Sequence, residues 1–86
     1  MTVVRVRGPL KQLAGGCADH EIEGATVVQL LRAFELANPA ASGWILDERG
    51  RIRRHINVFL NGEQVDEAEA VSSGDLVDVL PAITGG

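Results

Sequence analysis

Alternating apolar and polar positions predict three main strands in this chain. Residues 2–7, 55–60 and 76–80 are rich in β-branched side chains and alternate along their length. Successive side chains of a strand point to opposite faces of a sheet, so one face of each strand can be assigned to the core. The residues expected on that core face are Val4, Val6, Ile56, Val58, Leu60, Val77 and Val79.

The apolar pattern changes to a helical period between residues 26 and 37. Four apolar positions with this spacing would share the buried face, namely Val27, Leu30, Leu31 and Phe34. Thr26 is a good N-cap, and Gln29 stands three residues later, as in a capping box. Asn38-Pro39 ends the helix, because a residue before proline is pushed out of the α region. Arg32 and Glu35 are expected on the solvent side.

Two stretches between these elements are predicted to be irregular. Gly15-Gly16 marks a loop that leads to a short strand at residues 20–23, with Ile22 pointing inward. Residues 39–54 form the longer irregular stretch, in which Trp44-Ile45-Leu46 is expected to tuck one turn under the helix. The charged loop 47–54 would turn at Gly50.

The second half of the chain carries three turn signals. Asn61-Gly62 predicts a two-residue hairpin after the strand 55–60, followed by a short returning strand at 63–65. A single turn is expected at residues 66–70, and residues 72–75 form a tight turn before the last strand, which Pro81 ends.

The resulting order is strand, strand, helix, strand, short strand, strand. It predicts an α+β fold in which a mixed sheet of four to five strands carries one main helix on one face. The first and last strands would be parallel at the centre. This is the β-grasp, or ubiquitin-like, topology, with residues 1–81 as the domain and residues 82–86 as a flexible tail.

Composition narrows the function classes. The 86 residues include 12 acidic and 8 basic side chains, so a nucleic-acid partner is not expected. Four arginines within residues 49–54 suggest an anion site, but two acidic neighbours favour a solvated loop. A lone cysteine, no secretory signal and no long apolar run predict a cytoplasmic protein without a membrane partner.

The candidate reactive side chains are isolated. Cys17 is expected in a small, semi-buried apolar role, and His20 and His55 are expected on strand surfaces. No spacing suits a metal site or a catalytic triad, so no enzyme activity is predicted.

The chain resembles the small sulfur carriers of the ubiquitin-like superfamily, the MoaD/ThiS group. That group includes the molybdopterin synthase small subunit, the thiamine-pathway carrier and the carrier of an alternative cysteine pathway. The resemblance rests on the element order, on His55-Ile-Asn-Val-Phe-Leu-Asn-Gly-Glu63, on Ser-Gly-Asp75, and on the ending Leu80-Pro-Ala-Ile-Thr-Gly-Gly86. The long stretch 38–54 is nearer to the molybdopterin and cysteine-pathway carriers than to the shorter thiamine-pathway ones.

The resemblance implies chemistry at the chain end. An activating enzyme of the ubiquitin-activating type would use ATP to adenylate the carboxylate of Gly86, and sulfur would then convert it to a thiocarboxylate. A sulfur-accepting biosynthetic enzyme would take that sulfur, while the carrier itself binds no cofactor. Thr84, Gly85 and Gly86 would form the functional tail, because glycine passes a narrow channel without steric clash. Strand parity places Arg5, Phe59 and Leu80 on the sheet face opposite the helix, with Phe59 and Leu80 exposed, and these residues together with Ile83 in the tail are the expected partner-binding residues.

Other functions start from the same tail. A ubiquitin-like modifier would be conjugated through Gly86 to target lysines, and the single Lys11 restricts polymer chains through its own lysines. A third class is an interaction domain whose diglycine end is incidental, since chain ends are often frayed. Molybdopterin, cysteine and thiosugar pathways all remain open.

Overall fold

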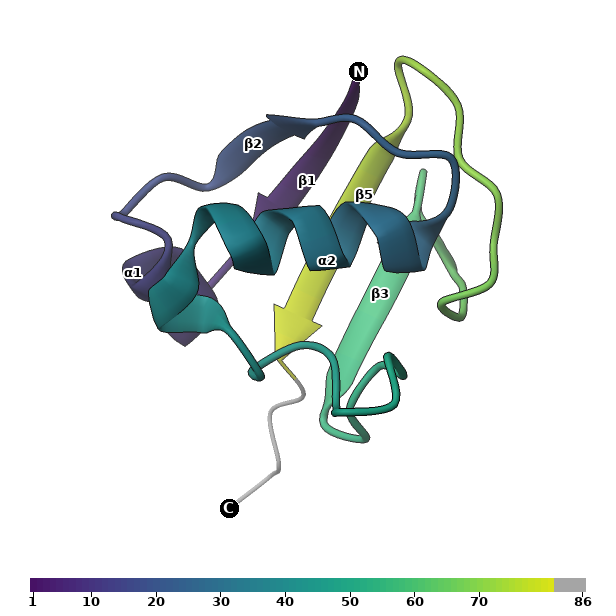
Figure 1. Cartoon of the computed structure of the whole chain (residues 1–86). Coiled ribbons are helices and arrows are strands. Elements are labelled where there is room, and N and C mark those ends of the chain that lie inside the picture. Colours follow the sequence, from purple (N-terminus) through teal and green to yellow (C-terminus); the bar gives the residue numbers. More distant parts are fainter. Residues whose placement is uncertain (82–86) are drawn as a thin grey trace.

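Over residues 1–81, which are the residues that the structure describes, the protein folds as a mixed five-stranded sheet with a helix across one face (Figure 1). The structure is a computed structural model. The predicted tail, residues 82–86, lies outside the described residues. The strands are β1 (Thr2–Val6), β2 (Asp19–Ile22), β3 (Ile56–Leu60), β4 (Glu63–Gln64) and β5 (Leu76–Pro81), in the spatial order β2-β1-β5-β3-β4.

The strand directions match the predicted topology. β1 pairs with β5 in parallel, whereas the pairs β1–β2, β3–β5 and β3–β4 are antiparallel. Helix α2 (Val27–Ala37) packs across the sheet. The predicted β-grasp fold, with its first and last strands parallel at the centre, is therefore confirmed.

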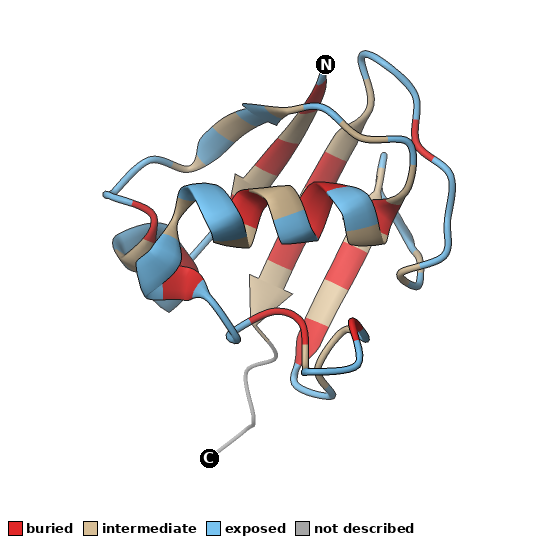
Figure 2. Cartoon of the chain, viewed as in Figure 1, coloured by how far each residue is buried: buried red, intermediate tan, exposed pale blue. Residues whose placement is uncertain are grey.

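The core lies between α2 and one face of the sheet (Figure 2). The four predicted helix residues are fully buried, as are the paired valines of β1 and β5. Of the residues predicted to face the core, Ile22 and Leu60 are only half-buried, and both pack against the edge of the core. Period-2 and period-3.6 patterns thus assigned the core faces correctly.

The N-terminus of α2 is capped from two directions. The Thr26 hydroxyl accepts a hydrogen bond from the Gln29 amide at 3.3 Å, as predicted. The Gln29 side chain reaches back to the amide of Ala25 at 2.8 Å, one residue before the N-cap. The amides of Val27 and Val28 donate to carbonyls of the 66–70 turn, so the free donors of the first helical turn are satisfied.

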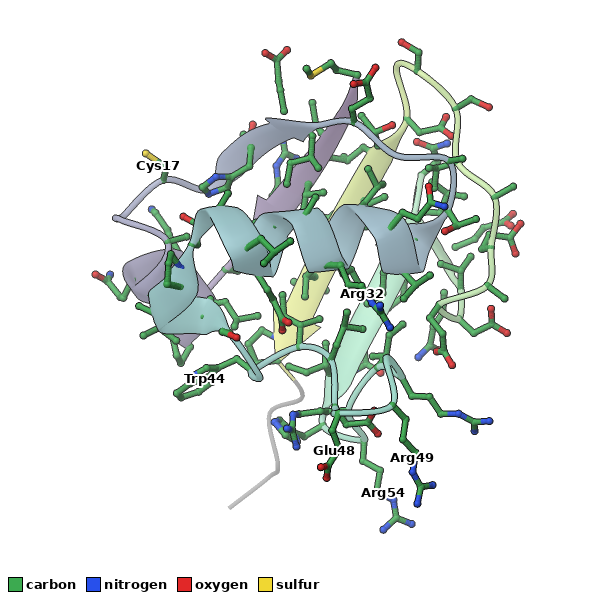
Figure 3. All side chains as sticks on the ribbon, viewed as in Figure 1. Cys17, Arg32, Trp44, Glu48, Arg49 and Arg54 are labelled. Atoms are coloured by element: carbon green, nitrogen blue, oxygen red, sulfur yellow. The ribbon has the colours of Figure 1, made fainter. Side chains whose placement is uncertain are left out.

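A short helix stands where a loop was predicted. Helix α1 (Pro9–Leu13) begins with Pro9 in its first turn and buries Leu10. No side chain caps this helix, so its main local signal is proline at the start. The loop around Gly15-Gly16 follows it and leads to β2. The semi-buried role predicted for Cys17 is wrong, because this side chain is exposed on that loop (Figure 3).

The segment between α2 and β3 is anchored by Glu35. A single-turn 3₁₀ helix, η1 (Pro39–Ala41), follows α2. The Glu35 carboxylate then accepts hydrogen bonds from the amides of Ile45 and Leu46, both at 3.1 Å. Glu35 is half-buried and not on the solvent side as predicted. Ile45 and Leu46 are buried as expected, whereas Trp44 is 45% exposed.

The charged loop 47–54 turns at Gly50, as predicted. The backbone of Gly50 has φ +79°, and the residue is buried beneath the side chain of Arg32. Asp47 stabilises the turn by accepting hydrogen bonds from the amides of Arg49 at 2.9 Å and Arg51 at 3.0 Å. These bonds, the one from Arg51 first, lower the pKa of Asp47.

Two predicted turns contact each other at the far end of the sheet. Asn61 and Gly62 form the hairpin turn with φ values of 51° and 91°. The Asn61 side chain donates to Asp75 at 3.0 Å and accepts from the amide of Leu76 at 2.9 Å. The hairpin and the 72–75 turn are therefore joined, which fixes where β5 begins.

Replacing Glu35 should loosen the segment between α2 and β3. Glu35→Ala leaves two partly buried amides without a charged acceptor, and we expect a loss of about 1–3 kcal/mol of unfolding free energy. Urea unfolding followed by circular dichroism measures this loss. Glu48→Ala, which removes an exposed carboxylate from the same segment, should change stability by less than about 0.5 kcal/mol. Equal midpoints for the two variants would contradict the anchoring role.

Candidate functional site

The end of β5 is the point from which the predicted tail continues. Pro81 is the last described residue and pairs with Ile56, so β5 extends one residue beyond its predicted end. On the other side Gly8 borders Pro81, since a Cβ at Gly8 would lie 4.0 Å from the proline Cγ. The end of β1 and the start of β3 therefore flank the root of the tail. The predicted tail residues Ile83, Thr84, Gly85 and Gly86 lie outside the described residues.

The structure brings three predicted partner-binding residues to one sheet face. Arg5 pairs with Asp78 across β1 and β5, and Asp78 pairs with Phe59 across β5 and β3. Leu80 lies two residues after Asp78 on the same face, opposite Asn57. This face is opposite to the one that α2 covers, as strand parity predicted. We call Arg5, Phe59 and Leu80 the outer patch.

The outer patch is less exposed than predicted. Phe59 and Leu80 were expected to be exposed, but both are half-buried. Gln64 stands opposite Phe59 and Asn57 opposite Leu80, and the Gln64 amide donates to the Asn57 side-chain oxygen at 2.9 Å beside them. Among the described residues the exposed large apolar side chains are Met1, Leu36 and Trp44.

Arg5 is already engaged within the chain. Its guanidinium holds both carboxylate oxygens of Asp19, at 2.7 Å and 3.1 Å. The hydrogen bond from Arg5 lowers the pKa of Asp19, and the same bond raises the pKa of Arg5. A partner that binds the outer patch therefore meets an ion pair and not a free cation.

Asp78 lies at the centre of the outer patch. Its Oδ1 is buried and has no hydrogen-bond partner, and the closest cation is the Arg7 guanidinium at 3.6 Å. Across the three central strands, the outer patch therefore places two charged side chains, Arg5 and Asp78, beside the aromatic ring of Phe59.

The two histidines do not form a reactive site. His20 is half-buried on β2, where its ring packs edge-on against Phe34 at 5.0 Å between ring centroids and contacts the Cys17 carbonyl at 2.8 Å. It therefore helps to cover the core, in place of the strand-surface position predicted for it. His55 is exposed and precedes β3, and no group of three potential metal-binding side chains occurs within residues 1–81.

No helix in the part of the chain that the structure describes is long and apolar enough to span a membrane.

A second group of residues near Pro81 was not predicted as a site. A shallow depression of about 240 Å³ is lined by Ser42, Gly43, Trp44, Arg53 and His55. The Arg53 guanidinium donates to the carbonyl of Gly43, which holds the two loops together. Because β3 runs antiparallel to β5, the residues just before Ile56 must lie beside the end of β5. The predicted antiparallel pairing of β3 with β5 is therefore the feature from which the position of these residues near Pro81 could have been inferred.

Comparison with known proteins identifies relatives along nearly the whole chain. The model of the ThiS family matches residues 4–86. Small archaeal modifier protein 1 of Haloferax volcanii is 36% identical over 67 residues, which cover 77% of each chain. The sulfur carrier protein CysO of Mycobacterium tuberculosis is 29% identical over 83 residues, covering 90% of this chain and 89% of the relative.

Solved structures agree with these sequence relatives. A chain in the crystal structure of the Amycolatopsis orientalis BexX/CysO complex superposes with a TM-score of 0.90 at 29% identity, covering 100% of both chains. The relatives named here are small carrier and modifier proteins, and none is named as an enzyme. The predicted resemblance to the MoaD/ThiS group is confirmed: this chain belongs to the ThiS family.

Proposed function

We propose that this protein carries sulfur as a thiocarboxylate on Gly86. The observation that supports this most directly is the family match, which extends over the β-grasp body and through the Ala-Ile-Thr-Gly-Gly sequence that follows β5. In the sequence the diglycine ends five residues after the last residue of the central strand β5, so the folded body would present that end to other proteins.

The chemistry begins with activation of a poor electrophile. An activating enzyme of the ubiquitin-activating type joins the Gly86 carboxylate to the α-phosphate of ATP and releases pyrophosphate. A sulfide sulfur then attacks the acyl carbon and displaces AMP, which leaves a thiocarboxylate. Where a persulfide attacks instead, the product is an acyl disulfide, and a thiol must cleave its S–S bond to release the thiocarboxylate and a new disulfide. The thiocarboxylate sulfur is anionic and nucleophilic at neutral pH, as a thiolate is.

The carrier is a protein substrate in this cycle and not an enzyme. A sulfur-accepting biosynthetic enzyme transfers the sulfur to a metabolite, and the carboxylate of Gly86 returns. Gly85 and Gly86 lack a Cβ, so they suit a narrow channel that leads to a buried site.

ATP is a co-substrate of the activating enzyme, and the carrier itself needs no bound cofactor. The exposed thiol of Cys17 fits a reducing compartment such as the cytoplasm.

The outer patch is proposed as the main docking surface for these enzymes. Phe59 and Leu80 supply apolar area on the face that α2 leaves uncovered, and Ile83 would continue that surface along the tail. The A. orientalis relative crystallised in a complex with BexX, so a protein of this fold binds a partner protein.

The second candidate function is protein modification. Similarity to small archaeal modifier protein 1 favours it, because that relative is named as a modifier. Both functions start from the same adenylate. Intact-mass analysis separates them: exchange of a terminal oxygen for sulfur indicates a carrier, whereas diglycine remnants on the lysines of other proteins indicate a modifier.

Gly86 should be indispensable for sulfur loading. Gly86→Val adds a β-branched side chain beside the reacting carboxylate, and we expect thiocarboxylate formation to fall at least about a hundredfold because the acyl carbon is misplaced. Mass spectrometry after incubation with the activating enzyme, ATP and a sulfur donor measures the loss. Ala82→Val places the same side chain earlier in the tail and should load normally. A Gly86→Val protein that gains sulfur like the native chain would overturn the proposal.

Phe59 should contribute to partner binding. Phe59→Ala removes the aromatic side chain of the outer patch, and we expect affinity for the activating enzyme to fall about tenfold. Titration calorimetry measures this change, with thermal unfolding to verify that the variant is folded. Leu36→Ala is the matched control, because Leu36 is 82% exposed on α2, away from the patch. Equal affinities for the two variants would remove Phe59 from the docking surface.

A further inference from the structure

The charges of this acidic protein are separated between its two ends. Six cationic side chains lie at the end where β5 finishes, accompanied by the carboxylates of Asp19, Asp47 and Glu48. These six, which we call the cationic collar, are Arg7, Lys11, Arg49, Arg51, Arg53 and Arg54.

Strand directions place the collar around the root of the tail. β1 and β5 are parallel, so both finish at the same end of the sheet, and antiparallel β3 begins there. Arg7 follows β1, and Lys11 lies on α1 one turn beyond Gly8, which borders Pro81. Arg53 and Arg54 stand three and two residues before Ile56, the first residue of β3, which pairs with Pro81.

The opposite end of the sheet is acidic. It comprises the end of β2, the β3–β4 hairpin and the loop that leads into β5. Among the described residues this end carries seven carboxylates and no lysine or arginine. The seven are Glu21, Glu23, Glu63, Asp66, Glu67, Glu69 and Asp75.

Three collar arginines, Arg49, Arg51 and Arg54, are available to a partner, whereas Arg7 pairs with Asp78 and Arg53 donates to the Gly43 carbonyl. Within residues 1–81 the ion pairs are Arg5–Asp19 and Arg7–Asp78, so the four arginines of the loop 47–54 have no carboxylate within 4.0 Å. Asp47, their acidic neighbour, directs an oxygen to the backbone amides of its own turn. Figure 3 shows Arg49 and Arg54 extending away from the sheet at this end of the molecule.

Trp44 provides an apolar contact beside the collar. It is exposed in the depression that it shares with Arg53 and His55, and Figure 3 places it at the same end as Arg49 and Arg54. Tryptophan and arginine are the residue types that most often dominate binding energy at protein interfaces. An exposed tryptophan beside arginine side chains is therefore a surface suited to binding another protein.

The short tail requires that a partner cover this end. Gly86 lies five residues beyond Pro81, and this stretch spans at most about 18 Å when fully extended. An enzyme whose buried active site receives Gly86 must therefore bring its channel entrance against the residues around Pro81. The collar and Trp44 are those residues.

We infer that the cationic collar docks on an acidic protein surface that rims the channel of the activating enzyme, with Trp44 packed against an apolar part of that rim. The identity of this partner rests on the proposed function. A compact acidic rim is favoured over nucleic acid as the occupant, because the collar surrounds the root of a tail that must enter a protein channel. Trp44 is also the one exposed Phe, Tyr or Trp side chain within residues 1–81, which is too few for stacking on successive bases. The collar steers the tail toward the channel, and the outer patch supplies apolar contact once the proteins meet.

The test compares two variants of equal net charge. Arg49→Gln/Arg54→Gln removes two collar charges, whereas Ala68→Glu/Ala70→Glu adds two carboxylates at exposed positions of the acidic end. Binding of each full-length protein to the ubiquitin-activating-type enzyme of the same organism is measured by titration calorimetry, and ATP–pyrophosphate exchange is measured in parallel. At about 50 mM salt we expect the collar variant to bind about tenfold more weakly than the native chain, and the control to bind as the native chain does. At about 500 mM salt this difference should largely disappear.

Trp44→Ala provides a second, charge-neutral variant. It should also weaken binding about tenfold, but without the salt dependence, because apolar contacts are not screened.

Four outcomes would contradict the inference. Equal binding of the collar variant and the native chain overturns it, as does an equal loss in the control, which would reflect net charge alone. Failure of the native chain to bind the enzyme at low salt also overturns it. If single-stranded oligouridine binds the native chain and not the collar variant, the occupant is a nucleic acid and the inference is wrong. Collar-dependent binding without pyrophosphate exchange would uphold the collar and refute adenylation, so the two proposals fail separately.

Discussion

Parallel pairing of β1 with β5 is the constraint on which the rest of the fold depends. Its register sets Val4 beside Val77 and Val6 beside Val79, and these four side chains have no exposed surface. Neighbouring parallel strands cannot be joined by a tight hairpin, so the chain between them must cross the sheet. Here that crossing carries α2 over the valines, and two hairpins add β2 and the β3–β4 pair at the edges. The same pairing brings the ends of β1 and β5 together and therefore decides what surrounds the tail.

Local sequence signals predicted an element correctly where a residue's own conformational preference or capping side chain determines the structure. α2 has the predicted bounds because Thr26 accepts the Gln29 amide at one end and Asn38-Pro39 ends the helix at the other. The hairpin at Asn61-Gly62 formed because both residues tolerate positive φ. α1 was missed because five residues without a capping side chain depend on packing of Leu10 against the core, which no local pattern reveals.

Strand parity predicted part of the candidate site, and register decided the rest. Parity placed Arg5, Phe59 and Leu80 on one face, and the structure agrees. Parity cannot tell that β2 brings Asp19 opposite Arg5, which converts an expected free cation into an ion pair. Glu35 was misjudged for a similar reason: helical spacing placed it away from the core, but the segment 42–46 returns over that side of α2 and uses its carboxylate.

Net charge describes this protein poorly because its charges are separated by distance. The two ends are separated by the length of β5, whose six residues span about 20 Å, whereas the Debye length at physiological ionic strength is about 8 Å. A partner surface that approaches the end of β5 is therefore screened from most of the carboxylates at the opposite end. It meets a local excess of arginine although the chain as a whole carries a formal charge of −4. The overall acidity that argued against nucleic acid is thus compatible with a cationic surface around the tail, and the strand directions explain how one small sheet holds both.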